Sequence, residues 1–234
     1  MPIKLVVFDM AGTTVEDKNG VAHCLMAALA ADGVDVKLEQ VNAVMGIPKP
    51  LAIQSLIESE DEKRIDAIHR DFQARMIEHY RTSPDVREVP GATNVFNELR
   101  ARGIKVALDT GFDRTIVDVI LHRLGWDDQL LDATAASNEV VKGRPHPDLI
   151  FHLMKKTGIK DAAEVAKVGD TPSDLYEGTA AGCGLVIGVT EGSHTREQLS
   201  IHPHTDLVPS IRELPMLVFS SRRSRRLRGD VRND

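Results

Sequence analysis

The stretch IKLVVFDMAGTT, residues 3–14, decides the first part of the fold. Its first six residues are mostly apolar or β-branched, and the run stops at Asp9. A short apolar run of this kind is typical of a strand that is buried on both faces of a parallel sheet. We therefore expect a first strand that ends at Asp9, followed directly by a turn that contains glycine and threonine.

From residue 19 to about residue 82 the pattern changes. Apolar residues recur at spacings of three and four, and no strand-like run separates them. This period is typical of amphipathic helices that pack their apolar faces together. We therefore predict an all-helical insert, carried by AHCLMAALAA (22–31), PLAIQSLI (50–57) and KRIDAIHRDFQARMIEHY (63–80).

Beyond a Pro- and Gly-marked connection near residue 90, helical patterns alternate with strand-like runs. Several of the helical patterns are closed by a glycine, among them Gly103 and Gly125. Alternation of this kind implies right-handed crossovers and a parallel sheet. The strand-like runs are residues 104–108, about 130–135, 164–168 and 184–189.

Together these patterns predict an α/β fold. The core is a Rossmann-like, doubly wound parallel sheet of residues 1–15 and 89–218, and a helical cap of residues 16–88 is inserted after the first strand. Residues 219–234 hold six arginines and two aspartates and lack a periodic apolar face, so we expect a disordered basic tail. A homodimer contact through the cap helices is a further expectation.

Composition limits the classes of function. The 234 residues carry 29 basic and 35 acidic side chains, a net charge of −6, which argues against general binding to nucleic acid. Two cysteines are too few for a disulfide framework, and the apolar runs are far shorter than the ~20 residues that cross a bilayer. We expect a cytoplasmic protein that acts on a small molecule, with no nucleic-acid or membrane partner.

Four polar residues follow the predicted strands. Asp9 ends the first, Thr110 follows the second, and Arg144 and Asp170 come later in the chain. Ligands of open α/β sheets bind at the carboxyl ends of the strands, so these side chains are expected to meet there. Two carboxylates favour Mg²⁺, while the guanidinium and the hydroxyl suit phosphate oxygens. The set predicts phosphoryl transfer through an aspartyl intermediate.

These residues resemble the motifs of the haloacid dehalogenase superfamily. DMAGTT is similar to the first motif, Thr110 with Gly111 to the second, Arg144 in GRPHPD to the third, and GDTPSD at 169–174 to the fourth. The resemblance runs from residue 3 to about residue 218 and implies that Asp9 is the nucleophile.

The same resemblance implies a role for further residues around the phosphate. Mg²⁺ would be held by Asp9, the backbone carbonyl of Ala11 and Asp170, and Asp174 would support the metal site. The backbone amides of Gly12 and Thr13 would face the phosphate, beside Thr110, Gly111 and Arg144.

Ala11 departs from the phosphatases of the superfamily, which carry a second aspartate there as general acid and base. Alanine at this place resembles the phosphonatase branch, the phosphonoacetaldehyde hydrolases and their relatives, which cleave a carbon–phosphorus bond. That branch is understood to use a cap lysine that forms a Schiff base with the aldehyde. Met45-Gly46-Ile47-Pro48-Lys49 reproduces its MGxxK stretch, so Lys49 and Met45 are expected at the substrate.

Agreement with the branch is incomplete. Ala52 and Phe112 stand where the branch has a histidine and a tyrosine that are thought to assist proton transfer. Lys49 is then open to two other interpretations, a specificity residue or a solvated lysine. For the whole chain, the alternatives are a phosphatase of small phosphomonoesters and a non-catalytic binding protein.

The histidines are weaker candidates. His194, His202 and His204 lack the spacing of a closed zinc set, so roles in loops or caps are favoured over metal binding. His146 lies close to Arg144 in the sequence and is a candidate for ligand contact.

Overall fold

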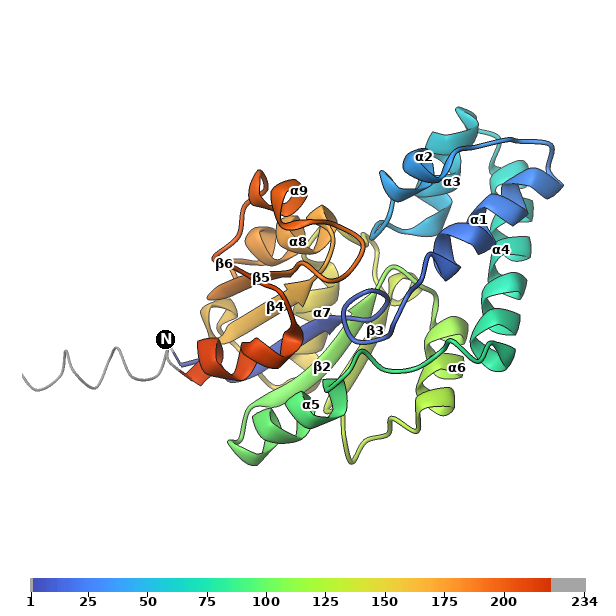
Figure 1. The fold of residues 1–234 in the computed structure, drawn as a ribbon. Helices are drawn as coiled ribbons and strands as arrows, with labels where there is room; N and C mark the ends of the chain where they lie inside the picture. Colours follow the sequence, from blue (N-terminus) through green and yellow to red (C-terminus); the bar gives the residue numbers. More distant parts are fainter. Residues whose placement is uncertain (1, 220–234) are drawn as a thin grey trace, which may run out of the picture.

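The computed structural model describes residues 2–219. A six-stranded parallel sheet forms the core, in the order β3-β2-β1-β4-β5-β6 (Figure 1). The chain builds one half of the sheet outward from β1 and then returns to β4, so the strand order reverses between these two strands. The strands are β1 (Leu5–Asp9), β2 (Lys105–Thr110), β3 (Ala133–Ala136), β4 (Val165–Gly169), β5 (Leu185–Val189) and β6 (Asp206–Val208).

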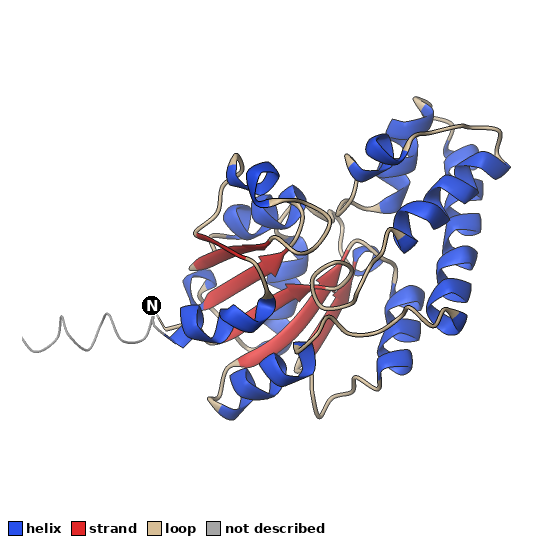
Figure 2. Ribbon diagram, viewed as in Figure 1, coloured by secondary structure: helices blue, strands red, loops and turns tan. Residues whose placement is uncertain are grey.

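Helices cover both faces of this sheet (Figure 2). Alternate residues of β1 enter two separate apolar clusters: Val6 and Phe8 pack on the side of α5, and Leu5 and Val7 on the side of α7. Burial on both faces explains why the strand is apolar throughout. The core helices are α5 (Ala92–Ala101), α6 (Arg114–Leu124), α7 (Asp148–Thr157), α8 (Pro172–Ala181) and α9 (Arg196–Ser200), with short 3₁₀ turns at Ser137–Glu139, Ala162–Glu164 and Ile211–Glu213.

A group of four helices follows β1 and lies beside the carboxyl ends of the strands (Figure 1). The longest helix, α4, begins after Asp61, whose carboxylate accepts the backbone N–H groups of Lys63 and Arg64. It packs against α1 and α3, and also against α6 of the core. Its buried face carries Ile65, Ile68, Phe72, Met76 and Tyr80. The four helices are α1 (Gly20–Ala31), α2 (Leu38–Asn42), α3 (Lys49–Ile57) and α4 (Glu62–Thr82).

The two chain crossings between core and cap lie side by side. The amide of Val89 donates to the carbonyl of Thr14 at 2.8 Å, and the amide of Glu16 donates to the carbonyl of Arg87 at 3.0 Å. These two hydrogen bonds tie the outgoing and the returning backbone connections together.

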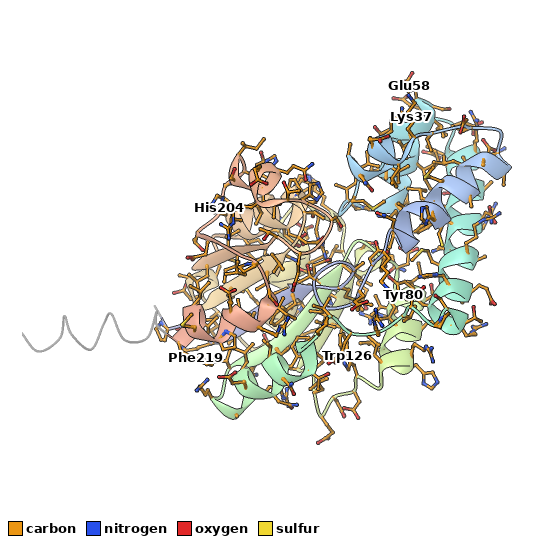
Figure 3. The ribbon with its side chains drawn as sticks, in the orientation of Figure 1. Lys37, Glu58, Tyr80, Trp126, His204 and Phe219 are labelled. Atoms are coloured by element: carbon orange, nitrogen blue, oxygen red, sulfur yellow. The ribbon has the colours of Figure 1, made fainter. Side chains whose placement is uncertain are left out.

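The structure differs from the sequence-based expectation at three places. The third strand begins at Ala133 rather than near residue 130, because the amides of Leu130 and Leu131 bond back to the carbonyl of Asp127 in a turn. The pattern also missed α2, α9 and β6, which are too short for periodicity to detect. Phe219, assigned to the tail, lies 3.7 Å under the guanidinium of Arg102, while the rest of the predicted tail is outside the described residues (Figure 3).

Within residues 2–219, no helix combines the length and the apolar character that crossing a membrane requires.

Candidate active site

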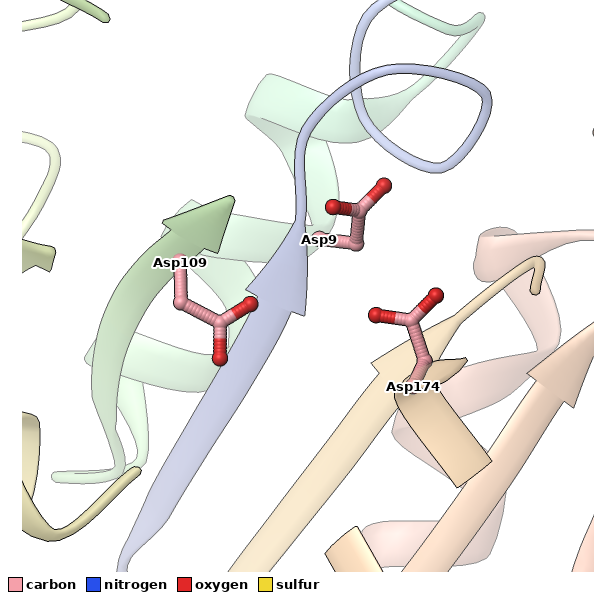
Figure 4. A group of neighbouring side chains, drawn as sticks. All are labelled: Asp9, Asp109 and Asp174. Atoms are coloured by element: carbon pink, nitrogen blue, oxygen red, sulfur yellow. The ribbon is translucent and has the colours of Figure 1, made fainter. Parts of the chain in front are cut away.

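Three carboxylates converge at the carboxyl ends of the central strands (Figure 4). Asp9 ends β1 and pairs in register with Asp109 of β2, while Asp174 comes from the first turn of α8. One oxygen from each lies within 4.8 Å of the other two. Asp109 was missed by the sequence analysis, although an aspartate within the apolar run VALDT is a signal for a buried, paired charge.

Arg144 lies among these three carboxylates. One terminal nitrogen of its guanidinium donates to Asp9 at 2.6 Å and to Asp109 at 2.7 Å, and the other donates to Asp174 at 2.7 Å. The side chain is only 1% exposed. Because the guanidinium occupies the space between Asp9, Asp109 and Asp174, these three do not form a vacant metal site together.

A second layer of buried charge lies below Arg144. Lys167 of β4 makes a short contact with Asp109, and its ammonium is 2.8 Å from Glu177 and 3.2 Å from Asp174. Burial lowers the pKa of Lys167, but the surrounding carboxylates raise it by more, so the ammonium stays charged. Neither Lys167 nor Glu177 was predicted, although a lysine inside the apolar strand EVAKV must find a partner.

Gly12 and Thr13 lie in the loop that follows β1, and the expectation that their amides face the phosphate stays a prediction. Their amides donate within the loop, to the carbonyls of Val15 at 2.8 Å and Met10 at 3.2 Å. Their role is to hold Asp170: a Cβ on Gly12 would lie 2.4 Å from its carboxylate, and the hydroxyl of Thr13 donates to it at 2.8 Å. Gly12 has φ +87°, which only glycine adopts readily.

A small cavity of about 30 Å³ lies between these strand ends and the cap. It unites most of the site residues predicted from the sequence with several that were not. The predicted residues in its lining are Asp9, Ala11, Met45, Lys49, Thr110, Gly111 and Arg144. The others are Asp17, Val21, Gly46, Phe112, Thr171 and Ser193.

Lys49 is the first residue of α3 and points into this cavity from the cap. It is 3% exposed, so the interpretation as a solvated lysine is wrong. Its ammonium has one weak hydrogen bond, at 3.5 Å to the carbonyl of Ile47, and lies 5.9 Å from the ring centre of Phe112. Burial and then the charge of Arg144 lower its pKa from 10.5 to about 8, although Asp9 and Asp17 oppose the shift.

Glycines let the MGIPK loop sit directly on the core. A Cβ on Gly46 would lie 2.4 Å from the hydroxyl of Thr171, and one on Gly111 would lie 3.1 Å from the carbonyl of Ile47. A Cβ on Gly143, beside Arg144, would lie 2.6 Å from the ring of Pro48. These close approaches position Lys49 opposite Asp9.

The charge balance of the site fits a divalent cation. Burial raises the pKa of Asp9 to about 8, even though Arg144 lowers it, and burial also raises the pKa of Asp170. With every group ionised, the buried side chains hold two more negative than positive charges, an excess that one divalent ion neutralises. The carboxylates are Asp9, Asp109, Asp170, Asp174 and Glu177, and the cations are Lys49, Arg144 and Lys167.

The histidine candidates lie away from this cavity. Nδ1 of His202 contacts the hydroxyl of Tyr176 at 3.1 Å, and Nδ1 of His204 contacts the carbonyl of His202 at 2.7 Å. His146 is exposed and does not line the cavity. Among the described residues, the three-aspartate cluster is the one group whose ligand atoms lie as close together as those of a metal site, and no histidine belongs to it.

A family model for haloacid dehalogenase-like hydrolases matches residues 3–182. The chain belongs to this family. Membership in a family of hydrolases supports an enzyme over the non-catalytic alternative.

Curated relatives show which members of the family the chain resembles. The chain is 28% identical over 240 residues to a phosphonoacetaldehyde hydrolase of Bacteroides fragilis, covering 94% of this chain and 89% of that protein. It is 29% identical over 217 residues to a phosphonoacetaldehyde hydrolase of Lysinibacillus sphaericus, covering 85% and 80%. The hydrolase is therefore similar to phosphonoacetaldehyde hydrolases along most of its length.

Solved structures show the same fold. A phosphonoacetaldehyde hydrolase-like protein from Oleispira antarctica superposes with a TM-score of 0.82 at 21% identity, covering 95% of this chain and 94% of that one. A predicted phosphoglycolate phosphatase from Haemophilus somnus superposes with a TM-score of 0.76 at 20% identity, covering 92% and 97%. At these identities the comparison concerns the fold alone.

Proposed function

We propose that this hydrolase cleaves the carbon–phosphorus bond of phosphonoacetaldehyde or a close analogue, using Mg²⁺, an aspartyl-phosphate at Asp9 and a Schiff base at Lys49. The observation that carries the proposal is the buried amine of Lys49, which lines the same small cavity as Asp9 and has a pKa of about 8. The names of the curated relatives support the same substrate.

The first step needs a neutral amine. With a pKa of about 8, roughly a tenth of the Lys49 side chains are unprotonated at pH 7, far more than for an ordinary lysine. The free amine attacks the aldehyde carbon, and water leaves to give an iminium ion. Its positive charge makes the adjacent carbon able to depart with the bonding electrons.

In the second step Asp9 attacks phosphorus. The electron pair of the carbon–phosphorus bond moves into the iminium and forms an enamine, so no bare carbanion is released. Arg144 already lies 2.6 Å from Asp9 and neutralises charge on the phosphoryl oxygens, while Thr110 lines the same cavity. Water then hydrolyses the aspartyl-phosphate, and the enamine takes a proton on carbon to give a second iminium, which water hydrolyses to acetaldehyde and free Lys49.

Mg²⁺ would be held by Asp9, the carbonyl of Ala11 and Asp170. The carboxylate of Asp174 supports this region indirectly, because its oxygens are engaged by Arg144 at 2.7 Å and by the hydroxyl of Thr171 at 2.6 Å. When bound, the ion supplies charge that ionises Asp9 and stabilises the phosphoryl group in transfer.

A cavity of about 30 Å³ is too small for a phosphonate, so the proposed function includes a movement of the MGIPK loop off the core to admit the substrate. Closure then excludes water from the iminium and presents Lys49 to the substrate.

A second candidate is a phosphatase of small phosphomonoesters. It is favoured by Phe112 and the fully buried Ala52, which give Lys49 apolar neighbours where the phosphonatase branch has proton-transferring groups. Ala11 predicts slow ester hydrolysis, since general acid–base help is typically worth ~10²–10⁴-fold. Ala11→Asp should then speed phosphomonoester hydrolysis, and an unchanged rate would count against this candidate.

The test of the main proposal is acetaldehyde release from phosphonoacetaldehyde with Mg²⁺. Wild-type protein should release acetaldehyde and phosphate in equal amounts, and Lys49→Arg, which keeps a positive charge but cannot form the imine, should release neither. Acetaldehyde release that survives Lys49→Arg refutes the Schiff base. If the protein releases phosphate from phosphomonoesters and not from phosphonoacetaldehyde, the result favours the phosphatase.

A further inference from the structure

Asp17 lies where two cavities meet. It lines the small cavity together with Asp9 and Lys49. It also lines an open cavity of about 360 Å³ beside the two chain crossings between core and cap, together with Glu16 and Arg87. Asp17 is the one residue common to both linings, among the residues that the structure describes. A proton on its carboxyl group can therefore pass between the active site and solvent.

The carboxylate of Asp17 is held by the cap. Its Oδ1 accepts the amide of Val21 at 3.2 Å in the first turn of α1. Gly20 makes room beside it: a Cβ there would lie 3.2 Å from this oxygen and 2.7 Å from Nε2 of His79. The charged or titratable groups that face Asp17 are Lys49 from α3, His79 and Tyr80 from α4, and Cys24 from α1.

The surroundings favour the protonated carboxyl. Burial raises the pKa of Asp17 above its usual value, and the amides of Val21 and Gly20, with His79 and Lys49, oppose the shift. The half-buried side chain thus holds its proton to a higher pH than an exposed aspartate does. A carboxylic acid with a raised pKa is suited to donate a proton in a reaction.

The reaction needs a donor that the rest of the cavity does not supply. Four side chains of its lining titrate or carry charge: Asp9, Asp17, Lys49 and Arg144. Asp9 is the proposed nucleophile, the nitrogen of Lys49 is bonded to the substrate in the imine, and Arg144 does not lose its proton. Ala11 carries no acid, so Asp17 is the remaining titratable group of the lining.

We propose that Asp17 is the catalytic acid that protonates the leaving group, in place of the aspartate missing at Ala11. The inference rests on the proposed function. After the carbon–phosphorus bond breaks, the enamine carbon takes the proton of Asp17, and the nitrogen lone pair restores the iminium. Asp17 becomes a carboxylate and regains a proton from water in the open cavity. Water then releases acetaldehyde and free Lys49.

The variant that tests this is Asp17→Asn. Asparagine keeps an oxygen that can accept the amide of Val21, so the start of α1 is preserved while the transferable proton is lost. Turnover of phosphonoacetaldehyde should fall at least ~100-fold. One equivalent of phosphate per enzyme should still appear in a burst, because the enamine forms but is not protonated.

The second substrate is p-nitrophenyl phosphate, whose leaving group needs no proton. Its hydrolysis should change less than about twofold in Asp17→Asn. Asp85→Asn is the matched control: Asp85 is exposed in the other connection and does not line the small cavity, so both substrates should keep wild-type rates. An equal fall for both substrates in Asp17→Asn, or no fall for either, overturns the assignment.

The proposed phosphonate reaction and the role of Asp17 can be refuted independently. If wild-type protein releases no acetaldehyde, the phosphonate reaction is refuted, and ethyl phosphate replaces phosphonoacetaldehyde as the substrate with a poor leaving group. Asp17 would then protonate the ester oxygen, and Asp17→Asn should slow ethyl phosphate at least ~100-fold relative to p-nitrophenyl phosphate. Loss of that selectivity overturns the role of Asp17 for either substrate.

Discussion

The buried cations on the core side and on the cap side of the cavity differ in how they are paired with carboxylates. On the core side, Arg144 has carboxylate partners at 2.6–2.7 Å, and Lys167 is equally surrounded. On the cap side, Lys49 has one weak contact, at 3.5 Å to a carbonyl. Burial with partners keeps a cation charged, whereas burial without partners makes an amine easier to deprotonate. Under the proposed function, the paired cation of the core holds the phosphoryl group and the unpaired amine of the cap reacts with the rest of the substrate.

The largest expected effect is on the core side, at the nucleophile. Asp9→Asn should lower phosphate release at least ~10⁴-fold for every substrate, since the amide cannot form the acyl phosphate. Phosphate release under saturating substrate measures it, with circular dichroism as the check on folding. Residual turnover within tenfold of wild type would refute the assignment of Asp9.

Removing a cation should affect stability differently on the two sides. Lys167→Met leaves the buried carboxylates of Asp109 and Glu177 with Arg144 as their remaining cation and should cost about 3–5 kcal/mol of unfolding free energy. Lys49→Met removes a cation that burial already disfavours, so stability at pH 7 should be unchanged or higher. Urea unfolding of both variants measures the comparison. Equal losses would show that Lys49 is paired as firmly as Lys167.

The same contrast predicts a pH effect. Because folding lowers the pKa of Lys49 from 10.5 to about 8, the unfolded chain binds more protons between these values. The unfolding free energy of the wild type should therefore rise from pH 8 to pH 10.5 relative to Lys49→Met, by about 3 kcal/mol. Urea titrations of the pair across this window test the sign. Parallel curves would contradict a depressed pKa.

The smallest effect concerns the contact between the MGIPK loop of the cap and the core. Gly46 has φ +82° and would place a Cβ 2.4 Å from Thr171, whereas Gly33 has φ +81° and has nothing within 4 Å of a Cβ. Both alanine variants carry similar backbone strain, about 1–2 kcal/mol, but only Gly46→Ala should obstruct closure. We expect a kcat/KM about tenfold lower for Gly46→Ala than for Gly33→Ala. Equal values would show that this contact does not control closure.

The sequence predicts the parts of the site that follow strands. Asp9, Thr110, Arg144 and Asp170 come directly after apolar runs or within a recognisable motif, and parallel pairing brings the ends of such runs together. Lys49 was found through the MGIPK motif and is indeed buried in the same cavity as Asp9.

Other parts needed the three-dimensional arrangement. Lys167 and Glu177 lie inside a strand and a helix, where sequence spacing does not show which carboxylate meets which cation. The hydrogen bonds of the Gly12 and Thr13 amides depend on how the loop closes on itself. Asp17 is visible only where the cap meets the core, because its two cavities are formed by segments far apart in the chain.

The central claim is that Lys49 forms a covalent imine with the substrate. Protein incubated with phosphonoacetaldehyde, Mg²⁺ and sodium borohydride should lose activity in proportion to one label per chain. Mass spectrometry should find a reduced adduct on the peptide that contains Lys49, and none in Lys49→Arg. Turnover of the substrate with no adduct at Lys49 would contradict the account.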